Sequence, residues 1–159
     1  MTDLQPVMDA AATFLSVRPR SVTETRRRLR HLGYPHSLVD TVLDRFVEMG
    51  YLDDMQFARA WVESRDRARP KGEAALRREL ALKGIARQVI DDVLAERLDE
   101  AVGDDPNTTA ATALLERRRS ALEREQNPVK RRQKAYGLLA RNGFDPETAR
   151  QVASSFMID

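Results

Sequence analysis

The amino-acid sequence predicts an all-α protein of three tandem three-helix repeats, about nine helices, forming an elongated curved array. A pattern of Leu-x-x-x-Gly followed by an apolar residue occurs three times, beginning at Leu29, Leu80 and Leu139. After each glycine, apolar residues return six, nine and ten positions later, as on one face of a helix. No segment alternates apolar and polar residues for long enough to predict a strand.

The spacing of these glycines predicts the limits of the repeats. We expect repeats at residues 1–50, 51–102 and 108–159, with a hinge or tight turn at residues 103–107, where acidic residues meet glycine and proline. A unit of about 50 residues buries little apolar surface by itself. Packing between neighbouring repeats should therefore contribute to stability.

In the first repeat, capping residues predict where the helices begin and end. Ser21 and Glu24 form a capping box, so a helix should begin at Val22. Gly33 should end it, because glycine adopts the left-handed conformation without a Cβ clash. The next helix is delimited by Pro35 in its first turn, Met49 at its end and Gly50 after it.

In the second repeat, Asp53 and Gln56 have capping-box spacing, and Leu52 and Phe57 have the spacing of a hydrophobic staple. They predict the start of the fourth helix. The segment at residues 69–72, Arg-Pro-Lys-Gly, should interrupt that helix, since the residue before proline disfavours helical geometry.

In the third repeat, residues 108–125 predict one long helix with a very polar second half. Asn127-Pro128 and Asp145-Pro146 each place a capping residue before proline, so two further helices should begin there.

The composition limits the class of protein. The chain has no cysteine, which excludes disulfides and thiolate chemistry and agrees with a reducing compartment. No segment has the length and apolarity of a membrane span, and the N-terminal residues do not resemble a signal peptide. We therefore expect a cytoplasmic protein that makes no contact with membranes.

The formal net charge of +2 hides strong alternation along the chain. Residues 18–32 carry six arginines against one glutamate, residues 91–105 carry seven acids against one arginine, and residues 117–134 carry eight cations against two glutamates. A solvated helical array needs charged outer faces, which is one interpretation. The other is a periodic basic surface whose partner is an acidic polymer or protein.

The sequence contains no convergent set of catalytic residues. His31 and His36 are the only histidines and have no metal-binding partners at suitable spacing. Phosphate-binding glycine loops and nucleophile elbows are absent. We therefore predict no enzyme activity, no cofactor and no metal site.

Several motifs resemble those of the RecX family of bacterial recombination regulators. They are Arg18-Pro19-Arg20-Ser21, Gly50-Tyr51-Leu52-Asp53-Asp54 with Phe57-Ala58, Arg69-Pro70 with Gly72, Leu80 with Lys83-Gly84-Ile85, and Gly143-Phe144. The resemblance covers residues 11–156. It implies three tandem three-helix repeats, as the periodicity also indicates.

The resemblance further implies a regulator of the RecA recombinase in DNA repair and the SOS response. Such a protein binds in the groove of the RecA–single-stranded-DNA filament and restrains its recombinase, ATPase and coprotease activities. We expect a monomer that binds this filament, and single-stranded and double-stranded DNA, through basic faces. The alternative is a stand-alone nucleic-acid-binding module of helix-turn-helix-like repeats. Sequence-specific readout is disfavoured, since no helix N-terminus carries a consistent Asn, Gln and Arg cluster.

Two sets of residues follow as candidates. The cations expected to contact filament or DNA are Arg18, Arg20, Arg26, Arg27, Arg65, Arg69, Arg77, Arg78, Lys83, Lys130 and Arg131. The motif residues expected to be structural are Gly33, Gly50, Tyr51, Asp53, Phe57, Gly72, Gly84 and Gly143. Leu29, Leu80, Phe57 and Trp61 should lie in the core, and packing is also favoured for Tyr51.

Overall fold

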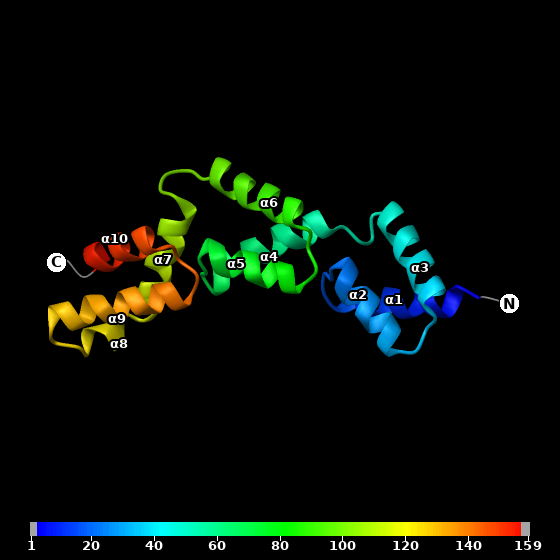
Figure 1. The fold of residues 1–159 in the computed structure, drawn as a ribbon, viewed down its shortest axis with the longest axis horizontal. Coiled ribbons are helices and arrows are strands. Elements are labelled where there is room, and N and C mark those ends of the chain that lie inside the picture. Colours follow the sequence, from blue (N-terminus) through cyan, green and yellow to red (C-terminus); the bar gives the residue numbers. More distant parts are fainter. Residues whose placement is uncertain (1–2, 157–159) are drawn as a thin grey trace. The chain divides into compact units, whose positions relative to one another are not determined.

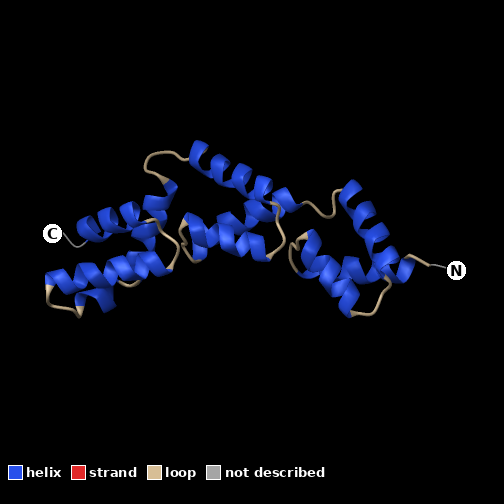
Figure 2. Ribbon diagram, viewed as in Figure 1, coloured by secondary structure: helices blue, strands red, loops and turns tan. Residues whose placement is uncertain are grey.

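The computed structural model describes residues 3–156, and within this range every regular element is a helix (Figure 2). This confirms the predicted all-α class. The ten helices, labelled in Figure 1, are α1 (Gln5–Val17), α2 (Val22–His31), α3 (His36–Glu48), α4 (Asp54–Ala68), α5 (Glu73–Leu82), α6 (Arg87–Asp99), α7 (Pro106–Arg117), α8 (Arg119–Glu123), α9 (Pro128–Arg141) and α10 (Pro146–Phe156).

Contacts divide the chain into two compact units. The first comprises Met1–Ala60 and Leu80–Ile90, and the second comprises Trp61–Glu79 and Asp91–Asp159. The division passes through α4, α5 and α6, so the helices of the middle repeat contribute to both units. Among the described residues, no helix is long and apolar enough to cross a membrane.

The core of the first unit is built from the apolar faces of α1, α2 and α3. Leu29 on α2 is fully buried between α1 and α3, as the Leu-x-x-x-Gly pattern predicts. The other buried members of this core are Val7, Ala11, Val39, Val42, Leu43, Phe46 and Leu52. The residues six, nine and ten positions after Gly33 are therefore core residues, which confirms the prediction from periodicity.

The predicted caps are present. The Ser21 side chain accepts a hydrogen bond from the Glu24 backbone N–H, and the Glu24 carboxylate accepts one from the Ser21 N–H. Asp53 accepts from Met55 and Gln56 at the start of α4. These bonds satisfy backbone donors that an α-helix leaves unpaired at its first turn.

The third repeat differs from the prediction of one long helix at residues 108–125. The helix ends at Arg117, and a separate short helix, α8, follows after Arg118, whose φ of −110° and ψ of 12° break the helical path. This break turns Leu122 into the core formed by α7, α9 and α10.

The turn after the second helix has the same hydrogen bonding in all three repeats. The glycine N–H donates to the carbonyl three residues earlier, and the next N–H donates to the leucine carbonyl five residues earlier, at Leu29, Leu80 and Leu139. The three glycines have φ values of +91°, +79° and +88°. A β-carbon is strained at such angles, which explains the glycine in the repeated pattern.

The turn of the second repeat is also a contact between repeats. The Ser21 hydroxyl, at the start of α2, donates to the Lys83 carbonyl oxygen at 2.7 Å. Gly84 lies so close to Thr23 that a β-carbon there would overlap the threonine side chain. The Asp54 carboxylate accepts from the Val22 N–H at 2.9 Å. The N-terminal end of α2 is therefore docked onto the following repeat.

The turn of the third repeat receives α5 in the same way. The Gly72 N–H donates to the Asn142 carbonyl oxygen at 2.8 Å, and the Ala74 N–H donates to the Gly143 carbonyl oxygen at 3.2 Å. A β-carbon on Gly72 or Gly143 would overlap the opposing backbone. Gly72 is thus structural, because the backbone there lies against the backbone of Gly143. The neighbouring Lys71 side chain donates to the Asn142 side chain at 2.8 Å.

The prediction that Trp61 lies in the core is wrong, whereas the favoured packing of Tyr51 is present at the surface. Tyr51 is 65% exposed, although its ring meets Phe46 edge-to-face at 5.6 Å. Trp61 is only half-buried: its indole N–H donates to Glu79 at 3.0 Å, and the Arg65 guanidinium lies 4.8 Å from its ring centre. In contrast, Phe57 and Leu80 are buried as predicted.

Candidate functional site

Of the candidate cations, Arg18 and Arg26 of the first repeat and Lys83 of the second pair with acids of the chain. Arg18 and Lys83 both pair with the Glu24 carboxylate, each at 3.0 Å. Burial alone would raise the pKa of Glu24, but the Ser21 N–H and the two cations outweigh it and hold that pKa below its usual value. Arg26 lies 3.6 Å from Asp40.

Arg20 makes a cation–π contact with an aromatic ring. Its guanidinium lies 4.0 Å from the centre of the Phe14 ring, and its Nε donates to the Phe14 carbonyl oxygen at 3.4 Å. Partial burial, and after it the charge of Arg18, lower the pKa of Arg20. The arrangement uses Arg20 to cover the C-terminal half of α1.

In the second unit, Arg65 and Arg77 form internal ion pairs. Arg65 lies 3.0 Å from Glu79. Arg77 contacts Asp91 at 2.6 Å and Glu73 at 3.3 Å, and the hydrogen bond to Asp91 is the main reason that its pKa is raised. Each guanidinium therefore has an acidic partner within the chain. That both residues contact filament or DNA stays a prediction.

Arg131 has a local structural role. Its Nε donates to the Glu125 carbonyl oxygen at 2.9 Å and so satisfies a carbonyl in the loop that follows α8. By contrast, Arg27, Arg69 and Arg78 are exposed, and no hydrogen bond or ion pair of their side chains occurs within residues 3–156. Among the candidate cations, these three and Lys130 remain available to a partner.

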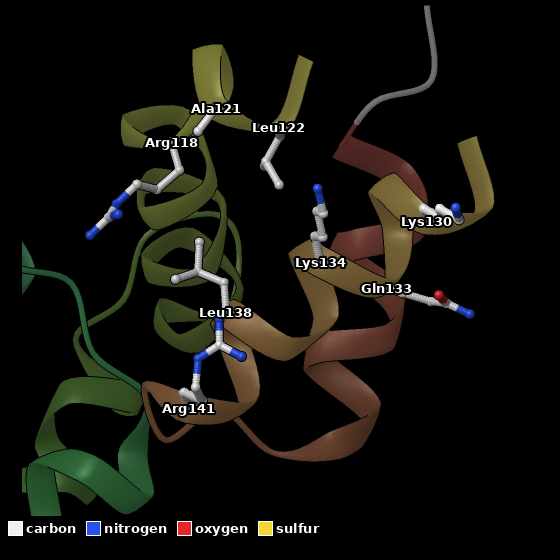
Figure 3. Close-up of a pocket in the computed structure, with 8 residues that line it drawn as sticks. All are labelled: Arg118, Ala121, Leu122, Lys130, Gln133, Lys134, Leu138 and Arg141. Carbon is white, nitrogen blue, oxygen red and sulfur yellow. The ribbon is translucent and has the colours of Figure 1, made fainter. Parts of the chain in front are cut away.

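A groove of about 700 Å³ lies between α8 and α9 in the second unit. Figure 3 shows Leu122 and Leu138 lying along the space between the two helices, with Arg118 and Arg141 on one side and Lys130 on the other. The complete lining consists of Arg118, Ala121, Leu122, Lys130, Gln133, Lys134, Leu138 and Arg141. Four of these residues are cations, and none of the eight is acidic.

The cations are placed by helical periodicity. Lys130, Lys134 and Arg141 are four and seven residues apart on α9, which puts them on one face of that helix. Arg118 comes from the break between α7 and α8. Lys134 also pairs with Glu125 at 3.0 Å, and this hydrogen bond is the main cause of the lowered pKa of Glu125.

This arrangement suits an anionic chain with apolar parts. Guanidinium and ammonium groups bind phosphate or carboxylate oxygens, and the partly exposed Leu138 side chain gives an apolar contact for a base or side-chain face. The groove is therefore the candidate functional site.

A second hollow, of about 570 Å³, is a weaker candidate. Its lining includes Arg77 and Arg78 but also the acids Glu73 and Asp145, so it presents both signs of charge. Within the described residues no group of histidine, aspartate or glutamate side chains has the arrangement of a metal site.

Sequence reasoning identified only one of the four groove cations, Lys130. Arg118, Lys134 and Arg141 were missed, although the periodicity of Lys130, Lys134 and Arg141 is visible in the sequence. Arg118 carried no such signal, because its position depends on the break between α7 and α8.

Comparison with known proteins matches all three repeats to domains of one family. Models of the first, second and third three-helix domains of RecX match residues 8–46, 53–94 and 106–153. The regulatory protein RecX of Mycolicibacterium smegmatis is 38% identical over 146 residues, covering 88% of this chain and 73% of that protein. The regulatory protein RecX of Prosthecochloris aestuarii is 31% identical over 156 residues, covering 98% and 97% of the two chains.

A solved structure supports the same fold. The crystal structure of RecX from Lactobacillus salivarius superposes with a TM-score of 0.80 at 18% sequence identity, and the match covers 96% of each chain.

Proposed function

Because this chain belongs to the RecX family of regulatory proteins, we propose that it binds the RecA–single-stranded-DNA filament and restrains its recombinase, ATPase and coprotease activities. The resemblance of the motifs to the family supplies the partner. The observation that supports a nucleoprotein partner is the groove between α8 and α9, whose lining includes four cations, of which Lys134 is paired with Glu125. This function implies a cytoplasmic location.

The residues that line the groove fit the DNA of such a filament. A DNA backbone presents evenly spaced phosphates, and each cation that contacts one releases counterions on binding. Leu138, which is only partly buried, offers an apolar contact against which a base or a sugar can pack. We therefore assign the groove to the DNA of the filament, and RecA contacts to other surfaces of the chain.

The test is the DNA-dependent ATPase of RecA, measured with increasing amounts of this protein. We expect inhibition at fewer than one molecule per RecA subunit. Unchanged ATPase up to a large molar excess would contradict regulation of RecA. If DNA binding persisted in that case, the chain would instead be a stand-alone nucleic-acid-binding module.

A paired variant tests the groove itself. Lys130→Gln with Lys134→Gln removes two groove cations, and we expect weaker binding to single-stranded DNA with a shallower salt dependence. The matched control is Arg132→Gln with Arg150→Gln, which removes the same charge from the same repeat outside the groove. Equal losses in the two double variants would mean that net charge, and not the groove, determines binding.

A further inference from the structure

A hollow of about 350 Å³ lies between α9 and α10, and we call it the α9–α10 hollow. Its lining residues recur at positions i, i+3, i+4 and i+7 along α9 and at i, i+3 and i+4 along α10, which places each set on one face of its helix. Ala153, a buried core residue, is part of the lining. The other lining residues are Val129, Arg132, Gln133, Tyr136, Arg150 and Ser154.

The cations of this hollow have no partner within the described residues. Arg132 and Arg150 are exposed, and no ion pair or hydrogen bond of either guanidinium occurs within residues 3–156. The Tyr136 hydroxyl also makes no hydrogen bond in that range, although its ring packs against the core. Helix α9 contains no acid, and Glu147, the one acid of α10, does not line the hollow. Two guanidinium groups and a phenol therefore line one space without a counter-charge.

These free donors match carboxylate groups. A guanidinium presents its N–H groups as a planar fork that fits both oxygens of a carboxylate, and the resulting hydrogen bonds are charge-assisted. The Tyr136 hydroxyl is a further donor on the α9 side of the hollow. The Val129 side chain is 51% exposed and Ala153 is apolar, so an aliphatic side chain next to the carboxylates also finds a surface to pack on.

The lining fits a peptide better than a nucleic acid. The side chains of Gln133 and Ser154 both donate and accept hydrogen bonds, so they match the N–H and C=O groups of a peptide backbone. A DNA backbone offers acceptors and no donor. Arginine and tyrosine are enriched in protein interfaces and lysine is depleted, and this hollow has two arginines, one tyrosine and no lysine. The groove between α8 and α9, in contrast, contains two lysines.

We propose that the α9–α10 hollow binds an acidic peptide segment of a partner protein. Two carboxylates of the segment pair with Arg132 and Arg150, the Tyr136 hydroxyl donates to one of them, and an aliphatic side chain packs on Val129. The proposal goes beyond the regulation of RecA, since it rests on the chemistry of the hollow and on no particular partner.

The hollow and the groove use different faces of α9. Gln133 lines both, and Figure 3 shows its side chain directed away from Leu122 and Leu138. The lysines of the groove, Lys130 and Lys134, do not line the hollow. Occupation of one face therefore leaves the other open, and the two can be tested separately.

A labelled peptide tests the proposal on the intact protein. The probe is fluorescein-labelled Glu-Asp-Leu-Glu-Asp-Leu, and its neutral match is Gln-Asn-Leu-Gln-Asn-Leu. Fluorescence anisotropy measures both at about 0.05 M salt, where screening is weak. We expect the acidic peptide to bind at least about tenfold more tightly than the neutral one, because charge-assisted hydrogen bonds are the stronger ones.

The two double variants already defined for the groove serve here with their roles exchanged. Arg132→Gln with Arg150→Gln should weaken binding of the acidic peptide at least about tenfold. Lys130→Gln with Lys134→Gln removes the same charge from another face of α9 and should weaken it less than about threefold. Equal losses in the two double variants, or equal binding of the two peptides, would overturn the proposal.

An unlabelled hexathymidylate strand tests whether the occupant is DNA instead. We expect an excess of this strand to leave the peptide bound, because the two ligands use different faces of α9. Displacement of the peptide by the strand would assign the hollow to nucleic acid and overturn the proposal.

Tyr136→Phe tests the contribution of the hydroxyl. It keeps the ring that packs on the core and removes only the donor, so we expect peptide binding about fivefold weaker and an unchanged thermal midpoint. Tyr51→Phe, at an exposed tyrosine outside the hollow, is the control and should change neither property. Equal peptide affinities of the two variants would refute the contact with Tyr136.

Discussion

The Ser21 hydroxyl donates a hydrogen bond to the Lys83 carbonyl oxygen at 2.7 Å across 62 residues of sequence. The same hydroxyl oxygen accepts the Glu24 N–H, so one side chain caps α2 and ties the first repeat to the second. The Ser21 side chain is fully buried, which makes both bonds costly to lose.

Ser21→Ala should therefore destabilise the protein more than loss of an ordinary cap. Loss of an N-cap costs about 0.5–2 kcal/mol, and the unpaired Lys83 carbonyl adds about 1 kcal/mol or more. Urea denaturation measures the change. Ser37→Ala, which removes an exposed hydroxyl near the start of α3, should change the free energy of unfolding by less than about 0.5 kcal/mol. Equal effects would contradict the dual role.

Glu24→Gln should destabilise the protein in a pH-dependent way. The folded-state pKa of Glu24 lies below its usual value of 4.5, so its carboxylate contributes stability above about pH 4.5 that is lost as the pH falls through the folded pKa. The stability difference between wild type and variant should be about 1–3 kcal/mol near pH 7 and shrink below pH 4.5. A difference that is constant from pH 7 to pH 3 would contradict the assignment.

Gly84→Ala and Gly50→Ala separate backbone strain from crowding. Both glycines have φ near +80°, so each substitution incurs a strain of about 1–2 kcal/mol. Only at Gly84 does the new methyl group meet Thr23, which adds about 1–3 kcal/mol of overpacking. Thermal unfolding should therefore rank Gly84→Ala as the less stable variant. The reverse order would contradict the close approach of the two repeats.

Arg77→Gln and Arg78→Gln should affect different properties although the residues are adjacent. Arg77 pairs with Asp91 and Glu73, so its loss should cost about 0.2–1 kcal/mol of stability. Arg78 is exposed and has no side-chain partner within the described range, so its loss should leave stability unchanged and weaken binding to anionic partners. Urea denaturation and DNA titration of both variants measure the two effects. If Arg77→Gln weakened DNA binding and left stability unchanged, the prediction that Arg77 contacts filament or DNA would be correct.

Leu29→Ala should cost about 2–5 kcal/mol, because it leaves a cavity in a fully buried core. Trp61→Ala should cost less than Leu29→Ala, since the indole is half-buried and lies beside Arg65 and Glu79. Calorimetry on both variants provides the comparison. A larger cost at Trp61 would indicate that its ring is a main part of the core.

The sequence by itself determined the repeated local structure. The capping box at Ser21, the cap at Asp53 and the glycine turns depend on residues fewer than six positions apart. Helical periodicity likewise placed Val39, Ile90 and their equivalents in the core, because burial follows one face of each helix. These features are local, so a single sequence specifies them.

Only the tertiary structure decided which cations are available to a partner. Arg18 and Lys83 meet at Glu24, and Arg77 reaches Asp91, through contacts between separate helices that charge counting along the chain does not reveal. The groove likewise depends on the break at Arg118, which turns α8 against α9. An arginine contributes the same charge wherever it stands, but whether an acid neutralises it depends on the packing of helices that are distant in sequence.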